Sequence, residues 1–223
     1  MKDLLFLAHR IPYPPNKGDK VRSHHLLRYL AERYRVYLGA FVDDPADWAH
    51  AEVLQGLCTQ TCLVGLNPIH ARVRALGGLL SGEAVSLPFY RSATMARWVE
   101  KVLARSLVER IVVFSSAMGQ YVPPRRAGDA RLVVDFVDVD SDKWRQYAEK
   151  KGWPASWVYQ REARALLSWE RRLAARSDAS FFVSAQEAAL FQRLAPEVAD
   201  KVTHVNNENL RRVLEMRLDR GGA

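Results

Sequence analysis

Short apolar runs recur along the chain, and stretches with helical spacing separate them. Such runs, without strict alternation of apolar and polar residues, are typical of strands that are buried on both faces of a parallel sheet. The predicted strands are Leu4–Ala8, Val36–Phe41, Cys62–Leu66, Ile111–Phe114, Leu132–Val137, Ser180–Val183 and Val202–Val205. Their alternation with helical segments predicts an α/β fold with a Rossmann-like parallel sheet flanked by helices.

The intervening segments carry the periodicity of amphipathic helices. The predicted helices are Val21–Glu32, Arg72–Leu80, Met95–Leu107, Asp142–Lys151, Ser156–Arg176 and Gln186–Leu194. The first of them completes a βαβ unit with the first two strands. We expect the second and third to cover the sheet, and Gly152 and Pro154 to separate the fourth from the fifth.

One domain accounts for most of the 223 residues. We assign residues 1–207 to it and residues 208–223 to an atypical charged C-terminal tail. Glu208–Arg220 is rich in arginine and completes no further βα repeat. We therefore expect the tail to be a loosely docked or frayed helix.

The net charge of +8 and the isoelectric point near 9.7 indicate a surface that attracts phosphate groups. The basic residues are dispersed along predicted helices, and Tyr and Phe do not alternate with them, so we favour solvated helix faces and expect no nucleic-acid partner. Peripheral contact with an anionic membrane remains compatible with this charge.

The apolar stretch in Met1–Ala8 is too short for a signal peptide or a membrane span, which favours a cytoplasmic protein, at most peripheral to the inner face of the cytoplasmic membrane. Cys58 and Cys62 are expected to be reduced thiols, because their spacing matches no redox or zinc motif.

A long loop stiffened by prolines follows the first predicted strand, and Gly18 stands just before the next helix. The loop leaves the strand at the carboxyl edge, where open α/β sheets bind ligands. Gly18 permits close approach of a ligand to the backbone, and the helix N-terminus offers free N–H groups to an anion. We therefore expect Lys17, Gly18 and Arg22 near an acceptor or phosphate group. The alternative is a structural turn, since neither a dinucleotide fingerprint nor a P-loop is present.

Carboxylates gather at the end of the fifth predicted strand. Asp138 is the candidate for binding a hydroxyl group or acting as a general base. Asp138 and Asp140 also have the Asp-x-Asp spacing by which metal-dependent GT-A sugar transferases hold a divalent ion, but such a short match often arises by chance. We assign no metal ligands and expect no cofactor.

Hydroxyl groups follow two other predicted strands. Ser115, Ser116 and Ser184 can line the cleft as donors to a ligand, or they can cap the next helix, which we favour for Ser184. Glu162 and Glu170 have the spacing of the donor-binding pair in many retaining GT-B enzymes. Both lie inside one helical pattern, however, so we expect a solvated or salt-bridged helix face and assign them no role in donor binding.

Three segments resemble the family 4 type glycosyltransferases of PEP-CTERM/exosortase-associated exopolysaccharide systems. They are Arg-Ile-Pro-Tyr-Pro-Pro-Asn-Lys-Gly-Asp-Lys-Val-Arg at 10–22, Phe-Ser-Ser-Ala-Met-Gly-Gln-Tyr at 114–121 and Asp-Phe-Val-Asp-Val-Asp-Ser-Asp-Lys-Trp at 135–144. Further similarity at 159–162, 170–171 and 183–191 extends the resemblance from residue 1 to about Asn207.

This resemblance implies the acceptor-side, N-terminal half of a GT-B enzyme, which transfers a sugar from a nucleotide-sugar donor to a glycan or lipid-linked acceptor. In the family a Gly-Val-Asp sequence and then the donor domain would follow Asn207, whereas here Glu208 follows. We accordingly expect a truncated or frame-disrupted product that is inactive alone, or a partner chain that supplies the donor half. Two other functions stay open: a non-catalytic module that binds an acceptor or a lipid phosphate, and a metal-dependent transferase that uses Asp138 and Asp140.

Overall fold

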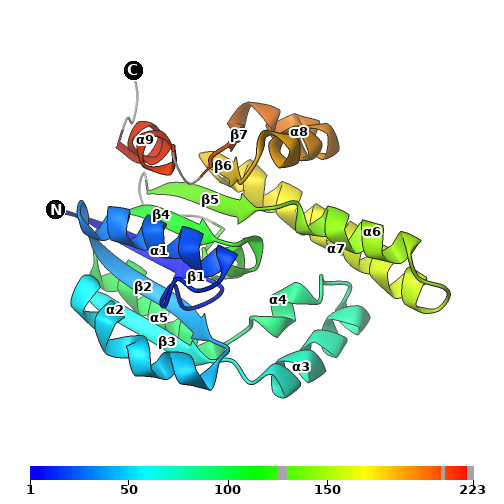
Figure 1. Ribbon diagram of the computed structural model, residues 1–223, viewed down its shortest axis with the longest axis horizontal. Helices are drawn as coiled ribbons and strands as arrows, with labels where there is room; N and C mark the ends of the chain where they lie inside the picture. The colour runs from blue at the N-terminus through cyan, green and yellow to red at the C-terminus, as the bar shows by residue number, and fades with distance from the viewer. Residues whose placement is uncertain (125–129, 207–208, 220–223) are drawn as a thin grey trace.

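The computed structural model confirms the α/β fold, and it describes residues 1–124, 130–206 and 209–219. Within these residues seven parallel strands form one sheet in the order β3-β2-β1-β4-β5-β6-β7 (Figure 1). The strands are β1 (Lys2–Ala8), β2 (Tyr34–Val42), β3 (Gln60–Gly65), β4 (Val108–Phe114), β5 (Arg131–Val137), β6 (Ala179–Phe182) and β7 (Val202–His204). Each predicted strand is confirmed, and each end lies within three residues of its predicted position.

The apolar runs form strands because helices cover the sheet on both faces. Along β1, Leu5 and Leu7 contribute to one hydrophobic cluster, whereas Leu4 and Phe6 contribute to another on the opposite face. Successive side chains of a strand point to opposite faces, so a strand that is covered twice must be apolar throughout.

Two sets of helices build the two apolar layers. One layer contains α1 (Gly18–Ala31), α2 (Ala51–Leu57) and α9 (Leu210–Leu214). The other contains α5 (Ala93–Arg105), α7 (Ala155–Arg176) and α8 (Ala185–Leu194). The remaining helices are α3 (Pro68–Ser81), α4 (Ser86–Phe89) and α6 (Asp140–Glu149), with short 3₁₀ helices at Pro45–His50 (η1), Ser116–Tyr121 (η2) and Pro196–Lys201 (η3) and a π-helix at Glu215–Asp219 (η4).

Two expectations about the helices are wrong. The predicted helix Arg72–Leu80 is part of α3, which reaches the core cluster of the sheet only through Ala71, packs mainly against α4 and leaves Ile69, Val73 and Leu76 facing solvent. The described part of the tail, 209–219, is not loosely docked. Leu210, Leu214 and Leu218 are buried in the cluster that contains α1, and their spacing places them on one helix face. Residues 207–208 and 220–223 of the predicted domain boundary and tail lie outside the described residues.

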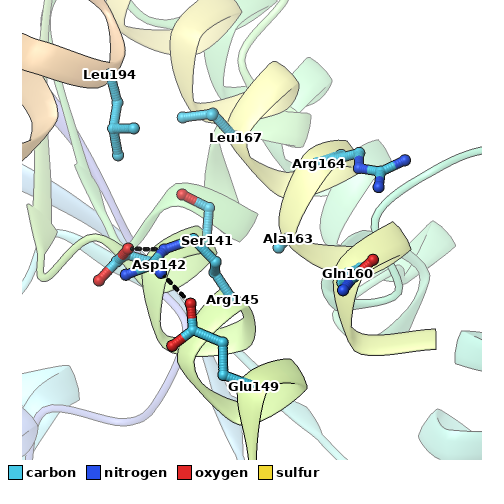
Figure 2. A pocket seen from close by; sticks show the side chains of 9 residues that line it. All are labelled: Ser141, Asp142, Arg145, Glu149, Gln160, Ala163, Arg164, Leu167 and Leu194. Carbon is cyan, nitrogen blue, oxygen red and sulfur yellow. Dashed lines mark hydrogen bonds and ion pairs between the residues drawn. The ribbon is translucent and has the colours of Figure 1, made fainter. Parts of the chain in front are cut away.

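Two helical arms extend past the carboxyl ends of the strands (Figure 1). The first arm is the antiparallel pair α6 and α7, and the second is α3 with α4. A pocket of about 380 Å³ lies between α6, α7 and the end of α8, where Ser141, Arg145 and Leu194 line it (Figure 2). Among the described residues, none of the helices combines the length and the hydrophobicity needed to cross a bilayer.

Candidate functional site

The strand order creates a topological switch point between β1 and β4. After β1 the chain crosses to the layer that contains α1, whereas after β4 it enters η2, whose Met118 and Tyr121 belong to the opposite layer. When the connections after two neighbouring strands run to opposite faces of the sheet, a crevice forms between them at the carboxyl edge. Ligands of open α/β sheets bind in this crevice. The loop before Gly18 and the serines after β4 flank this position.

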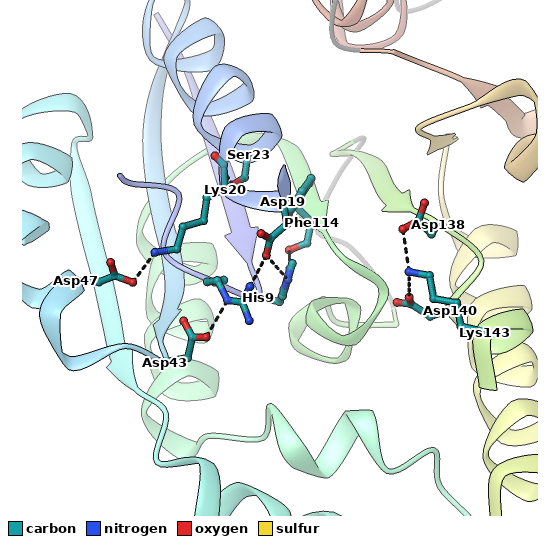
Figure 3. Close-up of polar contacts among 11 residues, drawn as sticks. His9, Asp19, Lys20, Ser23, Asp43, Asp47, Phe114, Asp138, Asp140 and Lys143 are labelled. Atoms are coloured by element: carbon teal, nitrogen blue, oxygen red, sulfur yellow. Dashed lines mark hydrogen bonds and ion pairs between the residues drawn. The ribbon is translucent and has the colours of Figure 1, made fainter. Parts of the chain in front are cut away.

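Four charged or polar residues form a connected cluster at the switch point, which we call the strand-end site: His9, Arg10, Asp19 and Asp43. Arg10 bridges the two carboxylates, with NH1 2.7 Å from Asp19 Oδ2 and Nε 2.9 Å from Asp43 Oδ2. The imidazole of His9 lies between Asp19 Oδ2 at 3.5 Å and the Phe114 carbonyl oxygen at 3.4 Å (Figure 3). The hydrogen bond from His9 and the charge of Arg10 hold the pKa of Asp19 well below its usual range, although burial opposes them. The carboxylate is therefore ionised at neutral pH.

Tyr90 connects the strand-end site to the end of β5. Its ring meets the His9 ring edge-on, with 5.9 Å between the ring centroids. Burial raises the pKa of Tyr90 to about 12, and the negative charges of Asp43 and Asp140 add to this effect. The hydroxyl group of Tyr90 is therefore neutral at neutral pH, and its pKa responds to the carboxylates that follow β2 and β5.

Asp138 and Asp140 share a single ammonium group at the end of β5. Lys143 Nζ lies 2.8 Å from Asp138 Oδ2 and 3.0 Å from Asp140 Oδ1 (Figure 3). The two carboxylates raise the pKa of Lys143 against the lowering effect of burial. Among the described residues, no group of three or more His, Cys, Asp or Glu side chains could hold a metal ion.

Backbone strain accompanies this cluster. Val137, the residue before Asp138, has a φ of 70°, in the left-handed region that a β-branched residue rarely adopts. Strain of this kind costs about 1–3 kcal/mol and is often found at binding sites. The outlier therefore favours a functional role for the end of β5.

Lys17 and Gly18 lie at the N-terminus of α1. The helix begins at Gly18, three residues before the predicted start, and Lys17 is its N-cap residue without a side-chain capping bond. Both residues are exposed, and a Cβ atom at Gly18 would meet no heavy atom within 4 Å. The first turn of α1 thus lies beside the strand-end site, where a helix N-terminus can bind an anion, and the backbone N–H of Lys20 in this turn already donates to the Asp19 carboxylate.

Arg22 does not lie at this surface. Its guanidinium is 2% exposed, and Nε lies 2.9 Å from Asp135 Oδ2, which is itself buried. Lys20 is likewise buried and pairs with Asp47 (Figure 3). In this structure Arg22 therefore ties α1 to β5.

The three serines occupy different environments. Ser184 Oγ accepts a hydrogen bond from the Glu187 backbone N–H at 3.2 Å, so its predicted capping role is confirmed. Ser116 is buried, and its carbonyl oxygen accepts a hydrogen bond from Trp169 Nε1. Ser115 is half-buried at the start of η2, directly after β4. Of the three serines, Ser115 is the best placed to contact a ligand at the switch point.

We expected a solvated or salt-bridged helix face for Glu162 and Glu170. The face is not solvated, because each residue is 1% exposed, but Glu162 does form an ion pair with Arg161 at 3.5 Å. Glu162 accepts hydrogen bonds from the backbone N–H groups at the start of α4, with Val85 N at 2.8 Å. Glu170 accepts hydrogen bonds from Ser141 at the start of α6, with Oγ at 2.6 Å and N at 3.3 Å. Both glutamates thus cap neighbouring helices from α7, which satisfies N–H groups that those helices leave open. Burial raises the pKa of Glu162, and it raises the pKa of Glu170 to about 8.

Sequence reasoning named neither the four residues of the strand-end site nor Tyr90 beside it as candidates. His9 and Asp43 directly follow the ends of β1 and β2, so the rule that strand ends carry ligand contacts could have found them. Asp19 lies in the loop and helix start that had been singled out. Tyr90 gave no signal, because it directly follows α4 and lies far in sequence from any strand end.

Comparisons with known proteins assign no family to the chain. No family model matches the chain, and no curated protein matches it. Among solved structures, it is similar to the N-terminal domain of trehalose-6-phosphate phosphatase from Candida albicans, with 14% sequence identity and a TM-score of 0.49. That similarity covers 93% of this chain and 45% of the other. The chain is therefore assigned by its own architecture, as an α/β protein with a Rossmann-like parallel sheet flanked by helices.

Proposed function

We propose that this chain is the acceptor-side half of a GT-B glycosyltransferase, which acts with a donor-binding half to transfer a sugar from a nucleotide-sugar to a glycan or lipid-linked acceptor. The observation that carries the proposal is the convergence of the three resembling segments. Segment 10–22 follows β1, segment 114–121 follows β4, and segment 135–144 spans the end of β5 and the start of α6. They are distant in sequence, yet all three meet at the switch point.

Specific contacts join these segments. The backbone N–H of His9, next to the first segment, donates a hydrogen bond of 2.7 Å to the Phe114 carbonyl of the second. The buried pair Arg22–Asp135 joins the first segment to the third. Residues that such contacts hold at one crevice are suited to orient a substrate, because catalysis by positioning needs fixed groups from several elements.

The surface groups divide into anionic and cationic sets that suit a phosphorylated sugar acceptor. Lys17 and the N-terminus of α1 provide positive charge for a phosphate group, whereas Arg10 is already paired with Asp19 and Asp43. Asp138 with Lys143 can accept hydrogen bonds from acceptor hydroxyls and donate them, while His9 is the imidazole nearest to the switch point. The donor-binding half would bring the nucleotide-sugar to this surface, so no cofactor enters the proposal.

The metal-dependent alternative finds less support. Lys143 Nζ occupies the space between Asp138 and Asp140 in which a divalent cation would lie, and the ammonium already compensates one of their two negative charges. A non-catalytic binding module would use the same strand-end site, so it differs from the proposed function only in the absence of sugar transfer.

Binding at the strand-end site can be tested on the chain itself by nuclear magnetic resonance. A short prenyl phosphate, the matching prenyl alcohol and a disaccharide are titrated into ¹⁵N-labelled protein. We expect the phosphate or the sugar to shift the amides of Lys17, Gly18 and Ser115, and the alcohol to shift none of them.

A matched pair of glycines supplies the control. Gly18 and Gly56 are both helical, and a Cβ at either would meet nothing within 4 Å, but of the two only Gly18 lies beside the strand-end site. Gly18→Leu should weaken binding by about tenfold or more, because its side chain covers the N-terminus of α1, and Gly56→Leu should leave binding unchanged. Shifts confined to other surfaces, or equal affinities for both variants, would contradict the proposal.

A further inference from the structure

A pocket of about 520 Å³, which we call the arginine pocket, lies between α7 and the segment that joins α3 to α4. One wall is a single face of α7, whose polar side chains follow one another at intervals of three or four residues: Arg161, Arg164, Ser168 and Arg172. The opposite wall is the turn at 81–84 together with Leu87 of α4. Sites for small molecules have volumes of about 300–1,000 Å³, so the pocket is large enough to hold one.

Arg161 holds the two walls together. Its guanidinium donates hydrogen bonds to the carbonyl oxygens of Gly78 and Glu83, both at 2.6 Å, and lies 3.5 Å from the carboxylate of Glu162. These bonds use carbonyl groups at and after the end of α3, which would otherwise repel an anion. Arg161 therefore fixes the shape of the pocket, and its charge is balanced by Glu162.

The other two arginines keep their charge available. Among the described residues, no carboxylate lies within ion-pairing distance of Arg164 or Arg172. Arg172 NH1 lies 2.5 Å from Ser168 Oγ, a neutral group. Figure 2 shows the Arg164 guanidinium on the side of α7 away from Arg145 and Glu149. The pocket thus holds two cations that have no charged partner in this part of the structure.

The acidic side chains nearby are occupied elsewhere. Glu83, which lines the pocket, pairs with Arg91 at 3.1 Å. Glu197, on the adjoining surface of α7, pairs with Arg171 at 2.6 Å. The positive balance of the pocket therefore comes from Arg164 and Arg172.

An apolar wall stands beside these two cations. It consists of Ala84 and Leu87, both buried, and the indole of Trp169. The Trp169 ring is fixed, because its Nε1 donates a hydrogen bond of 3.0 Å to the Ser116 carbonyl oxygen. The guanidinium carbon of Arg172 lies 6.0 Å from the centroid of this ring, at the outer limit of a cation–π contact. Cations next to an apolar wall suit an organic anion better than a bare inorganic one.

We propose that the arginine pocket binds a small phosphate monoester, with its phosphate group on Arg164 and Arg172 and its organic part against Trp169. At neutral pH such a phosphate group carries a charge of about −1.5 to −2, which two guanidinium groups match. Guanidinium groups also bind phosphate oxygens in pairs of parallel hydrogen bonds. None of the pocket's lining residues belongs to the strand-end site, so this second ligand site does not rest on the proposed function.

Nuclear magnetic resonance titration of the ¹⁵N-labelled chain tests the proposal. The probe is phenyl phosphate, and the comparisons are inorganic phosphate, which lacks the organic part, and phenyl sulfate, which has a single negative charge. The titrations use the Gly18→Leu chain, so that the N-terminus of α1 does not contribute. We expect phenyl phosphate to shift the amides of Gly82 and Ser168 and the indole N–H of Trp169. It should bind about tenfold more tightly than either comparison.

Variants on α7 separate the pocket from its general charge. Arg164→Gln and Arg172→Gln should each weaken binding of phenyl phosphate by about tenfold or more, because each removes hydrogen bonds to a charged group. Arg171→Gln is the matched control, since Arg171 adjoins Arg172 on the same helix but pairs with Glu197, and it should leave the affinity within about twofold. Ser168→Leu keeps every arginine and narrows the pocket, so it should weaken binding to a similar extent as Arg172→Gln. All four positions are exposed, so the fold should tolerate these changes.

Several results would overturn the proposal. They are the absence of binding, shifts confined to other surfaces, an affinity for inorganic phosphate equal to that for phenyl phosphate, and equal losses in Arg171→Gln and Arg172→Gln. Full binding by Ser168→Leu would place the anion on the open face of α7 instead. A short-chain phosphatidic acid carries the same group on a lipid and should bind no more tightly than phenyl phosphate, and a clear preference for it would make the pocket a headgroup site.

Discussion

Glu170 should make the stability of this protein depend on pH in an unusual direction. Its carboxyl group is 1% exposed on α7 and accepts hydrogen bonds from Ser141 at the start of α6. Burial raises its pKa from the ordinary 4.5 to about 8. The folded protein therefore keeps a proton on Glu170 up to about pH 8, whereas the unfolded chain releases it near pH 4.5.

The sign follows from proton linkage. Between these two pH values the folded state binds more protons than the unfolded state, so the free energy of unfolding falls as pH rises. Below pH 4.5 this contribution is fully present, and above pH 8 it is fully lost. Each pKa unit corresponds to about 1.4 kcal/mol, so a shift of this size amounts to roughly 3–5 kcal/mol.

Glu170→Gln removes the titrating group and keeps a carbonyl oxygen for the Ser141 N–H. The variant should match the wild type near pH 5 and exceed it by several kcal/mol near pH 9, measured by urea unfolding at a series of pH values. Glu197→Gln is the control, because Glu197 is exposed and pairs with Arg171 at the surface, and it should leave the pH profile nearly unchanged. Parallel profiles for wild type and Glu170→Gln, or a less stable variant at pH 9, would refute the reasoning.

Three further predictions concern the fold and the site. Arg22→Ala should lower the free energy of unfolding by about 3–5 kcal/mol, because it leaves Asp135 buried without its cation; a loss below about 1 kcal/mol in urea unfolding would contradict this structural role. Gly119→Ala should cost about 1–3 kcal/mol, since the added Cβ would lie 2.6 Å from the side chain of buried Leu173, and an unchanged melting temperature would show that this packing is looser. Calorimetric titration with manganese or magnesium should detect no micromolar site at the end of β5, because an ammonium lies between the two carboxylates; tight stoichiometric binding that Asp138→Ala abolishes would favour the metal-dependent reading.

The strands could be predicted from the sequence because a doubly covered strand has an unmistakable apolar run. The elements against which the helices pack could not be predicted in this way. The stripe Ile69, Val73 and Leu76 has the spacing of a buried helix face, and periodicity alone cannot say whether another element covers it. The opposite error was made for the C-terminal helix, which was expected to be loosely docked but is buried along Leu210 and Leu214. The many arginines of this segment drew attention away from its apolar face.

The site was predictable only in part. The placement of Gly18, Ser115 and Asp138 at the carboxyl edge of the sheet could be predicted, because the rule for open α/β sheets is local in sequence. Glu170 was misjudged because its hydrogen-bonding partner lies on a different helix, 29 residues away. Tyr90 was missed for the same reason, since tertiary packing alone brings it to His9.

The most direct measurement of the central claim is sugar transfer by a chimera. Residues 1–206 replace the acceptor-side half of a complete enzyme of the resembled family, and transfer of a radiolabelled sugar from its nucleotide-sugar to acceptor is followed. The proposal predicts transfer by the chimera, a loss of about tenfold or more in kcat/KM for the acceptor with Gly18→Leu, and a change within about twofold with Gly56→Leu. A folded chimera that binds the nucleotide-sugar yet transfers no sugar, or that responds equally to both variants, would contradict the assignment of the strand-end site as the acceptor site.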